Sequence, residues 1–254
     1  MGQINFVKSQ LKTVRESKMQ AVCVRSAIIV VAVIMITAIP AMIYLNWHFY
    51  FQNTLTMAGV PNYMDSEKSS LLQDPIQIDL EGYSESGEYK NKPIEITYKA
   101  YYDITGIITS VRDYWGLDAY DTLAPRDLCM IWGTLALQYP SPEMKFWHDN
   151  RVCNSEIGNV YIDPSDKGSR KGAFGVTHYG VSLISNNHLI PSTAEIRDRM
   201  FALGVGDTAR IVGYLVRVRY DGILLDSSMT RDDIIYDHSS TTCEIIYVTN
   251  VEKL

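Results

Sequence analysis

An uncharged apolar run constrains this chain more than any other feature of its sequence. It covers the twenty residues 26–45 and reads SAIIVVAVIMITAIPAMIYL. A helix rises about 1.5 Å per residue, so a helix of this length matches a hydrocarbon core about 30 Å thick. The sequence therefore predicts one transmembrane helix over residues 26–46. Its anchor residues are Ile28, Val33, Pro40 and Trp47; proline is tolerated there because neighbouring groups satisfy the freed carbonyl.

The residues after the run favour an anchor that is retained. Bulky aromatic side chains follow it, as is typical of the headgroup level of a bilayer. The alternative is a cleaved signal peptide, but that has a shorter apolar run and small residues before its cleavage site. The aromatic belt consists of Tyr44, Trp47, Phe49, Tyr50 and Phe51.

The charges on either side of the run predict its orientation. Five basic residues and one acidic residue precede Ser26. Basic flanks stay in the cytoplasm, so we expect residues 1–25 to be cytoplasmic. The whole chain has 23 Lys and Arg against 29 Asp and Glu, which leaves a net charge of −10 after the run. The expected location is a bacterial inner membrane, with the C-terminal part in the periplasm.

The acidic balance also limits the partners. Nucleic-acid binding needs clustered Lys and Arg to neutralise phosphates. Beyond the apolar run the only basic cluster is Lys167, Arg170 and Lys171, inside the turn-like DPSDKGSRKG. We therefore expect no nucleic-acid partner. The partners expected instead are the lipid bilayer and other envelope proteins, or a second copy of the chain.

The sequence divides into four parts. Residues 1–25 form an amphipathic tail, because Ile4, Val7, Leu11 and Val14 share one helix face. This helix either lies on the inner leaflet or docks a partner. Residues 26–46 are the transmembrane helix, and 47–92 are the aromatic belt followed by a polar linker. Residues 93–254 form the folded domain.

Alternating and helical spacings predict the elements of this domain. A long strand begins near Ile94 and contains Gly106, where a bulge or tight bend is expected. We expect a helix over 125–138 and a second over 192–203, the latter opened by a capping box of Ser192 and Glu195. Asn186, Asn187 and His188 would be turn or capping residues before it.

Two strands are expected at the C-terminal end. In GDTARIVGYLVRVRYDG the apolar parity changes at Gly213, which indicates a bulge in a strongly coiled strand. The last strand, TTCEIIYVTNVEKL, is apolar on both faces and therefore predicted to be buried on both.

The order of these elements resembles the OB-fold. A strand with an internal glycine, further strands, a capped helix, the segment GDTARIVGYLV and a terminal strand cover about residues 94–254. In that five-stranded barrel the helix falls between the third and fourth strands. The stretches LAPRDLCMIWG, SNNHLIP and CEIIYV are also similar to a group of uncharacterised bacterial membrane-anchored proteins. The resemblance implies a β-rich α+β fold: an OB-like, partly open barrel with one or two helices, preceded by a transmembrane helix.

The cysteines do not indicate a metal site. No CxxC spacing occurs among Cys23, Cys129, Cys153 and Cys243. In an oxidising compartment one disulfide and one buried thiol are expected, with Cys129–Cys153 as the first pairing to consider. Three buried thiols are the alternative. We expect no cofactor and no metal.

The histidines leave one catalytic alternative open. None of them pairs with a spacing that a metal or a standard hydrolase site requires. A non-standard site of an envelope hydrolase would have to combine His148, Asp149, His178 and His188.

The sequence favours a structural or binding function over catalysis. We expect no enzyme, but a structural or protein-binding subunit of an envelope assembly that presents the OB-like domain. The candidate binding surface is the aromatic-rich first strand, with Tyr98, Tyr101 and Tyr102. Ordinary packing of these tyrosines in the strand is the alternative.

Overall fold

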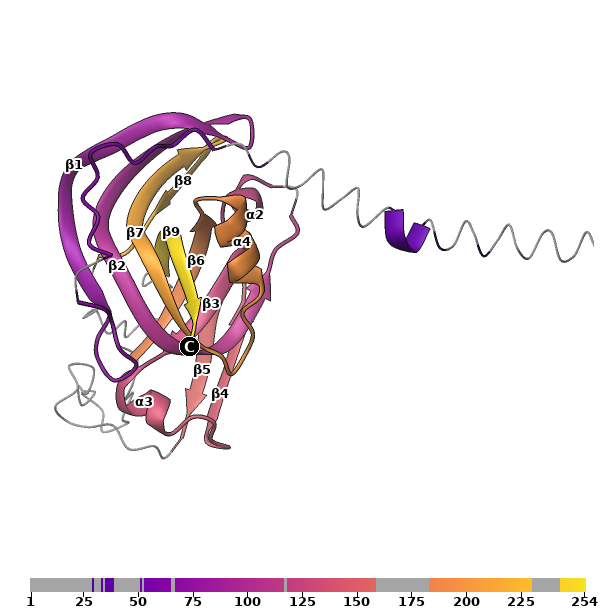
Figure 1. The fold of residues 1–254 in the computed structure, drawn as a ribbon. Coiled ribbons are helices and arrows are strands. Elements are labelled where there is room, and N and C mark those ends of the chain that lie inside the picture. The colour runs from indigo at the N-terminus through magenta and orange to yellow at the C-terminus, as the bar shows by residue number, and fades with distance from the viewer. Residues whose placement is uncertain are drawn as a thin grey trace, which may run out of the picture. The chain divides into compact units, whose positions relative to one another are not determined.

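The structure is a computed structural model of the 254-residue chain. It separates into two units, Met1–Phe51 and Gln52–Leu254. Figure 1 shows the fold of the second unit. The residues that the structure describes are 29, 33, 35–38, 51, 53–64, 67–116, 118–158, 183–229 and 243–254.

Little of the predicted transmembrane segment belongs to the described residues. Residues 29, 33 and 35–38 are helical, and Val33 is 52 % exposed. Ile28, Pro40 and Trp47 lie outside the described residues, as does the tail 1–25. No helix in the described part of the chain combines the length and the apolar character that a membrane crossing requires.

Five strands of the second unit pair in a closed circuit. β2 (Lys92–Asp113) pairs with β3 (Arg126–Ile131), β3 with β6 (Ile184–Pro191), and β6 with β9 (Cys243–Lys253). β9 pairs with β7 (Thr208–Tyr220), which returns to β2. Only the β6–β9 pairing is parallel. The expected β-rich, barrel-like fold with few helices is thereby confirmed.

Two outer strands extend this sheet. β1 (Ile76–Tyr89) pairs with the first half of β2, and β8 (Ile223–Asp226) with the end of β7. The predicted linker over 47–92 is therefore wrong from residue 76 onward. The segment reads as a linker because it is an outer strand with an acidic, largely solvent-facing sequence, for which apolar periodicity is not required.

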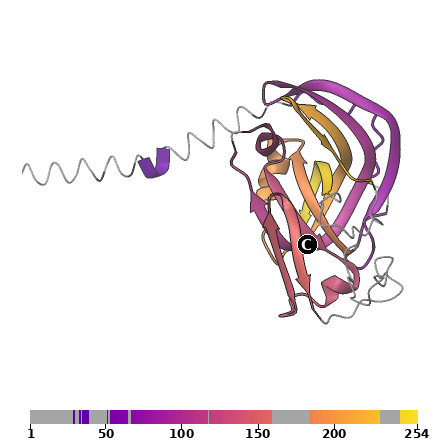
Figure 2. The same ribbon diagram turned by 180° about the vertical axis from the view of Figure 1, so that it is seen from behind.

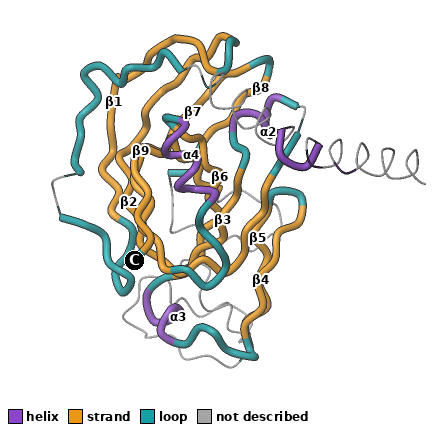
Figure 3. Tube along the Cα trace, turned by 45° about the vertical axis from the view of Figure 1, so that its right-hand side comes forward, coloured by secondary structure: helices purple, strands orange, loops and turns teal. Residues whose placement is uncertain are grey.

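Within the described residues, a hairpin and three short helices complete the unit. β4 (Met144–Asp149) and β5 (Val152–Ile157) form a separate two-stranded sheet. Figures 2 and 3 show this hairpin alongside the barrel strands, and its residues contact β2, β3 and β6. The helices are α2 (Ala119–Leu123), α3 (Gly133–Leu137) and α4 (Ala194–Phe201).

The helix predicted over 125–138 is wrong. Residues 126–131 are β3, and only Gly133–Leu137 are helical. All six residues of β3 are buried. A strand that is buried on both faces has an unbroken apolar sequence, and such a sequence also matches helical spacing.

The helix predicted over 192–203 is observed, but its cap differs. The N-cap is Thr193, whose side chain accepts a hydrogen bond from the Ile196 amide at 3.1 Å. The Ser192 amide instead donates to the Val248 carbonyl of β9. The predicted capping box of Ser192 and Glu195 is therefore wrong, because the strand pairing continues through Ser192.

Two glycines allow the tight curvature of the barrel. The register between β7 and β9 shifts at Val212/Gly213, which confirms the predicted bulge. A side chain at Gly213 would collide with the Tyr247 carbonyl. At Gly106 a Cβ would lie 2.8 Å from the Ile131 carbonyl oxygen, so this glycine permits a close backbone approach. The nearest register shift of β2 lies at Ile108/Ser110, not at Gly106.

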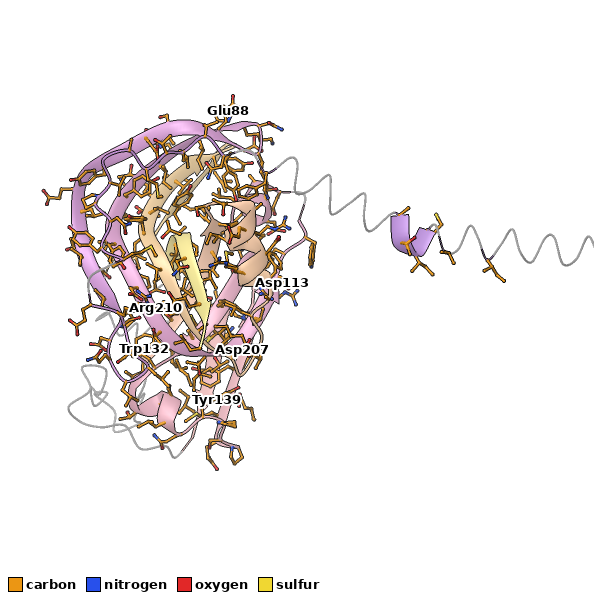
Figure 4. All side chains as sticks on the ribbon, in the orientation of Figure 1. Glu88, Asp113, Trp132, Tyr139, Asp207 and Arg210 are labelled. Atoms are coloured by element: carbon orange, nitrogen blue, oxygen red, sulfur yellow. A yellow bond between two sulfur atoms is a disulfide. The ribbon has the colours of Figure 1, made fainter. Side chains whose placement is uncertain are left out.

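The barrel interior is apolar, whereas a buried ion pair lies on its outer face. Its core includes Ile104, Leu128, Met130, Leu189, Ile211 and Ile246. α4 adds Ile196 and Met200 to it. Arg210, labelled in Figure 4, pairs with Asp103 at 2.7 Å, and both side chains are almost fully buried.

The tyrosines of the predicted binding surface are buried. Tyr98, Tyr101 and Tyr102 are 1, 1 and 0 % exposed. The Tyr98 ring packs edge-on against Tyr214, with ring centroids 5.3 Å apart. Tyr214 also donates a hydrogen bond to the Pro61 carbonyl, so the segment before β1 covers this face. The exposed aromatic surface expected from the sequence is wrong, and packing accounts for these residues.

Candidate functional site

Polar side chains gather on the outer face of β3, β6 and β9. Along β3, Leu128 and Met130 point into the core, so Asp127 and Cys129 point outward. Across the sheet Cys129 is in register with Asn186, and Asn186 with Cys243. This places three polar or sulfur-containing residues in one row. His188 follows on the same face of β6.

A buried carboxylate and a buried imidazole form the centre of the cluster. Asp127 is 0 % exposed and His188 is 2 % exposed. The Asp127 Oδ1 atom lies 2.7 Å from Nδ1 of His188, which is an ion-pair distance. The Tyr120 ring of α2 packs edge-on against the imidazole. Burial of this pair requires that the charges compensate each other.

The surroundings of His188 favour the protonated imidazole. Burial lowers the pKa of His188. Hydrogen bonding to Asp127 and to the Cys243 thiol raises it by more than burial lowers it, so the net pKa is about 9. The second ring nitrogen, Nε2, lies 3.4 Å from Asn186 Nδ2, and that amide nitrogen lies 3.2 Å from the Cys243 sulfur. The side chains therefore follow the order Asp127, His188, Cys243, and Cys243 is partly buried.

A cation from the β4–β5 turn fixes the carboxylate. Arg151 Nη1 lies 3.2 Å from Asp127 Oδ1 and donates to the Ala124 carbonyl at 3.1 Å. Nη2 of Arg151 pairs with Asp121 of α2. The guanidinium stacks between the rings of Tyr114 and Tyr120, at 3.6 and 3.8 Å from their centroids. Asp127 thus has a fixed orientation toward His188.

A second chain of hydrogen bonds reaches the same sulfur. Ser110 Oγ lies 2.8 Å from His148 Nδ1, and His148 Nε2 lies 3.3 Å from Asn186 Oδ1. Asn186 Nδ2 lies 3.2 Å from the Cys243 sulfur. Two series of side chains therefore converge on Cys243, one through His188 and the other through Asn186.

A disulfide holds the β4–β5 hairpin over this face. Cys129 of β3 and Cys153 of β5 are bonded, with their Cα atoms 5.6 Å apart. This is the pairing that the sequence analysis considered first. Within the described residues Cys243 is the free cysteine. It lies two strands away from Cys129, which at about 4.8 Å per strand is too far for a disulfide between them.

Only two of the four residues proposed for a hydrolase site lie close together in the described structure. His148 and His188 lie on either side of Asn186, whose side chain contacts both rings at 3.3 and 3.4 Å. Asp149 is exposed at the end of β4, on the opposite face of the hairpin from His148. His178 lies outside the described residues. The carboxylate that faces His188 is Asp127, not Asp149.

The sequence reasoning missed Asp127, Asn186 and Cys243 as members of one site. Asp127 falls in the helix predicted over 125–138 and Asn186 among the predicted turn or capping residues, although both belong to buried strands. The apolar stretch from Leu128 to Ile131 fits a buried strand as well as a helix, so local spacing gave no signal that separates the two.

The cluster has the composition of a nucleophilic site. A thiol, an imidazolium beside it and a carboxylate that orients the imidazole are the three parts of such a site. In the part of the chain that is described, no group of three or more His, Cys, Asp and Glu side chains is placed to hold a metal ion. No protein-family model, curated protein or solved structure matches the chain.

Proposed function

We propose that the protein is a thiol-dependent acyl hydrolase or acyltransferase of the cell envelope, with Cys243 as nucleophile. In this proposal residues 26–46 tether it to the inner membrane with the N-terminus in the cytoplasm, and residues 52–254 lie in the periplasm. The Cys129–Cys153 disulfide supports an oxidising compartment. The proposal revises the expectation of a non-enzyme in favour of the envelope-hydrolase alternative.

We also propose that the barrel is of the OB type. Three features support it: the circuit β2–β3–β6–β9–β7, the parallel pairing of β6 with β9, and the position of α4 between β6 and β7. In OB-folds the second and third strands form the usual ligand face. Here these strands are β3 and β6, which carry Asp127, Asn186 and His188.

The observation that carries the proposed activity is the 2.7 Å pair of Asp127 and His188 beside the Cys243 sulfur. An imidazolium next to a cysteine stabilises the thiolate, which is the reactive form of the residue. An odd cysteine in a domain that otherwise forms a disulfide also indicates a reactive thiol. The same cation and carboxylate in a purely structural role would not need a thiol beside them.

The proposed reaction follows from these positions. The Cys243 thiolate attacks the carbonyl carbon of an ester or amide, and the carbon–oxygen or carbon–nitrogen bond then breaks. His188 transfers its proton to the leaving group, which leaves a thioester on Cys243. Neutral His188 next takes a proton from water, or from an acceptor alcohol or amine, as this attacks the thioester. Cys243 leaves as thiolate.

The test uses the purified full-length chain in mild detergent and p-nitrophenyl acetate as an activated ester. Acylation of Cys243, followed by peptide mass spectrometry, should accompany release of nitrophenol. Cys243→Ala should abolish both, and His188→Ala should reduce both about 100-fold, as expected for loss of a general acid–base. Lys145→Ala is the matched control, since Lys145 is an exposed residue of β4 that pairs with exposed Glu156.

Ester turnover that survives Cys243→Ala, or a thiol that no acyl donor modifies, would contradict the proposed activity. Thermal unfolding of each variant separates loss of chemistry from loss of the fold. The Lys145→Ala variant should match the wild-type chain in turnover.

A structural or protein-binding subunit of an envelope assembly is the second candidate. The observation that favours it is the cover over the site: Asp127 and His188 are almost inaccessible beneath the hairpin and α2. Under this function the His188→Ala chain would capture the same envelope proteins in a mild-detergent pull-down as the wild-type chain. A stoichiometric set of captured proteins, together with no acylation of Cys243, would decide for the subunit.

A further inference from the structure

The side chain of Asn186 has an orientation that the surrounding groups determine. Its Nδ2 atom lies 2.6 Å from the Arg151 carbonyl, which can only accept a hydrogen bond. This contact identifies Nδ2 as the amide nitrogen and places Oδ1 on the side of His148. One of the two Nδ2 hydrogens is therefore used by Arg151, and the other remains for the groups near the sulfur.

The neighbouring histidine supports this orientation. Oδ1 of Asn186 accepts, so Nε2 of His148 must carry a hydrogen. Burial lowers the pKa of His148, which keeps the ring neutral at neutral pH and leaves Nδ1 as an acceptor. Ser110 then donates its hydroxyl hydrogen to Nδ1 across 2.8 Å. The series Ser110, His148, Asn186 is thus consistent in donors and acceptors from end to end.

The remaining Nδ2 hydrogen has two neighbouring heavy atoms, and the hydrogen bond runs to one of them. His188 Nε2 is 3.4 Å away and the Cys243 sulfur 3.2 Å away. The amide nitrogen donates to the sulfur, which is the nearer of the two atoms. The sulfur is consequently the atom toward which the amide N–H is directed. When the sulfur bonds to a carbonyl carbon, the carbonyl oxygen lies two bonds from it and within reach of the same N–H.

We propose that Asn186 is a catalytic residue whose side-chain amide donates a hydrogen bond to the oxyanion formed on attack by Cys243. His148 and Ser110 are positioning residues, because they hold the Asn186 amide and do not touch the reacting atoms. The inference rests on the proposed function, since it names the group that stabilises charge in that reaction. An amide fixed in advance and partly shielded from water is effective in this role.

The experiment compares two reactions of the same sulfur in the full-length chain. Alkylation by iodoacetamide displaces iodide and forms no oxyanion, whereas acylation by p-nitrophenyl acetate does form one. In Asn186→Ala we expect acylation of Cys243 to slow about 100-fold, the usual loss for one oxyanion donor. Alkylation should stay within about threefold, because Asp127 and His188 still stabilise the thiolate. Asn154→Ala on β5 is the matched control and should change neither rate; the Asn154 amide donates to the Val152 carbonyl.

A second pair of variants tests the role without changing Asn186. His148→Ala removes the donor that holds Oδ1 and should slow acylation about tenfold. His148→Gln places an amide N–H near the former Nε2 position and should restore most of the rate. This rescue would not occur if His148 only filled space in the hairpin interface.

The outcomes separate the inference from the proposed function. Selective loss of acylation in Asn186→Ala supports the oxyanion role. Parallel loss of alkylation and acylation would mean that Asn186 only positions the thiol, and unchanged acylation would mean that it is not involved; either result overturns the inference. A wild-type chain that is alkylated but never acylated at Cys243 overturns the proposed function, and the inference falls with it.

Discussion

At the scale of single residues, the buried Asp127–His188 pair has consequences for stability. Two buried charges lose their hydration and are tolerated only when they are paired and further hydrogen-bonded. Arg151 supplies the additional contact to Asp127. Each of these three residues is therefore costly to replace singly, because the partner would remain buried without compensation.

The raised pKa of His188 predicts a pH dependence of folding. The pKa is 6.5 for a free imidazole and about 9 in the fold. Because the folded chain binds this proton more tightly, the stabilisation is complete below about pH 6.5 and is lost as the pH rises through about 9. Its size is on the order of 3 kcal/mol, from about 1.4 kcal/mol per pKa unit.

Thermal unfolding at several pH values checks this dependence. The Tm of the wild-type chain should fall between about pH 6.5 and 9, and the Tm of His188→Gln should change much less over the same interval. Equal slopes for the two chains would show that the imidazole does not carry the effect.

Residue roles were less predictable from the sequence than residue types. His148 and His188 were recognised as candidate chemistry, but their partners Asp127 and Asn186 were not. The reason is physical: a polar residue before a proline, or near one, looks like a cap or a turn when only local spacing is considered. The partners come together through the β3–β6–β9 pairing, which joins residues more than fifty positions apart.

At the scale of elements, the strands with a clear period of two were predictable. The strand after Gly206 and its bulge at Gly213 follow from the change in apolar parity. β3 and β6 were not predictable in this way, because both are buried on each face and carry no alternation of polar and apolar residues. Outer strand β1 gave the opposite error, since its polar sequence resembles a linker.

The start of α4 offers a test of element assignment. Thr193 caps the helix by accepting from the Ile196 amide, whereas Ser192 still belongs to the strand pairing. Thr193→Ala should cost about 1 kcal/mol in the free energy of unfolding, and Ser192→Ala distinctly less. Chemical denaturation of both variants gives the comparison. A larger loss for Ser192→Ala would restore the cap expected from the sequence.

The disulfide is the second element-scale feature with a measurable effect. It links residues 24 positions apart. A loop of this size stabilises a fold by about 3 kcal/mol in the chain-entropy description. We expect Cys129→Ser to lower the Tm by several degrees, and a reductant to lower the wild-type Tm to the same value without a further effect on Cys129→Ser. A wild-type Tm that does not respond to reductant would contradict a disulfide in the folded chain.

At the scale of the whole molecule, the proposal places the barrel across a membrane from its N-terminal tail. The acidic balance beyond residue 45, the apolar run and the disulfide support this arrangement. Protease added to intact spheroplasts should digest the C-terminal region and spare the tail. A protected C-terminal region, or a mature N-terminus after Leu45, would contradict the proposed topology.

More of the overall architecture than of the site could be predicted from the sequence. The order of strands, a helix and two final strands predicted a barrel-like fold, because β2, β7 and β9 have recognisable strand patterns and α4 has a helical one. The site depends on which strands become neighbours and on a hairpin that covers them. Neither follows from local spacing, so Cys243 and Asp127 could be joined to His188 only in three dimensions.

The most direct test of the central claim is the rate at which iodoacetamide alkylates Cys243 at neutral pH, measured by peptide mass spectrometry in the wild-type chain and in His188→Ala. If Asp127 and His188 activate the thiol, the wild-type rate should exceed that of the folded variant by at least about tenfold. Equal rates in the two folded chains would contradict the account and leave the pair as a structural feature of the barrel.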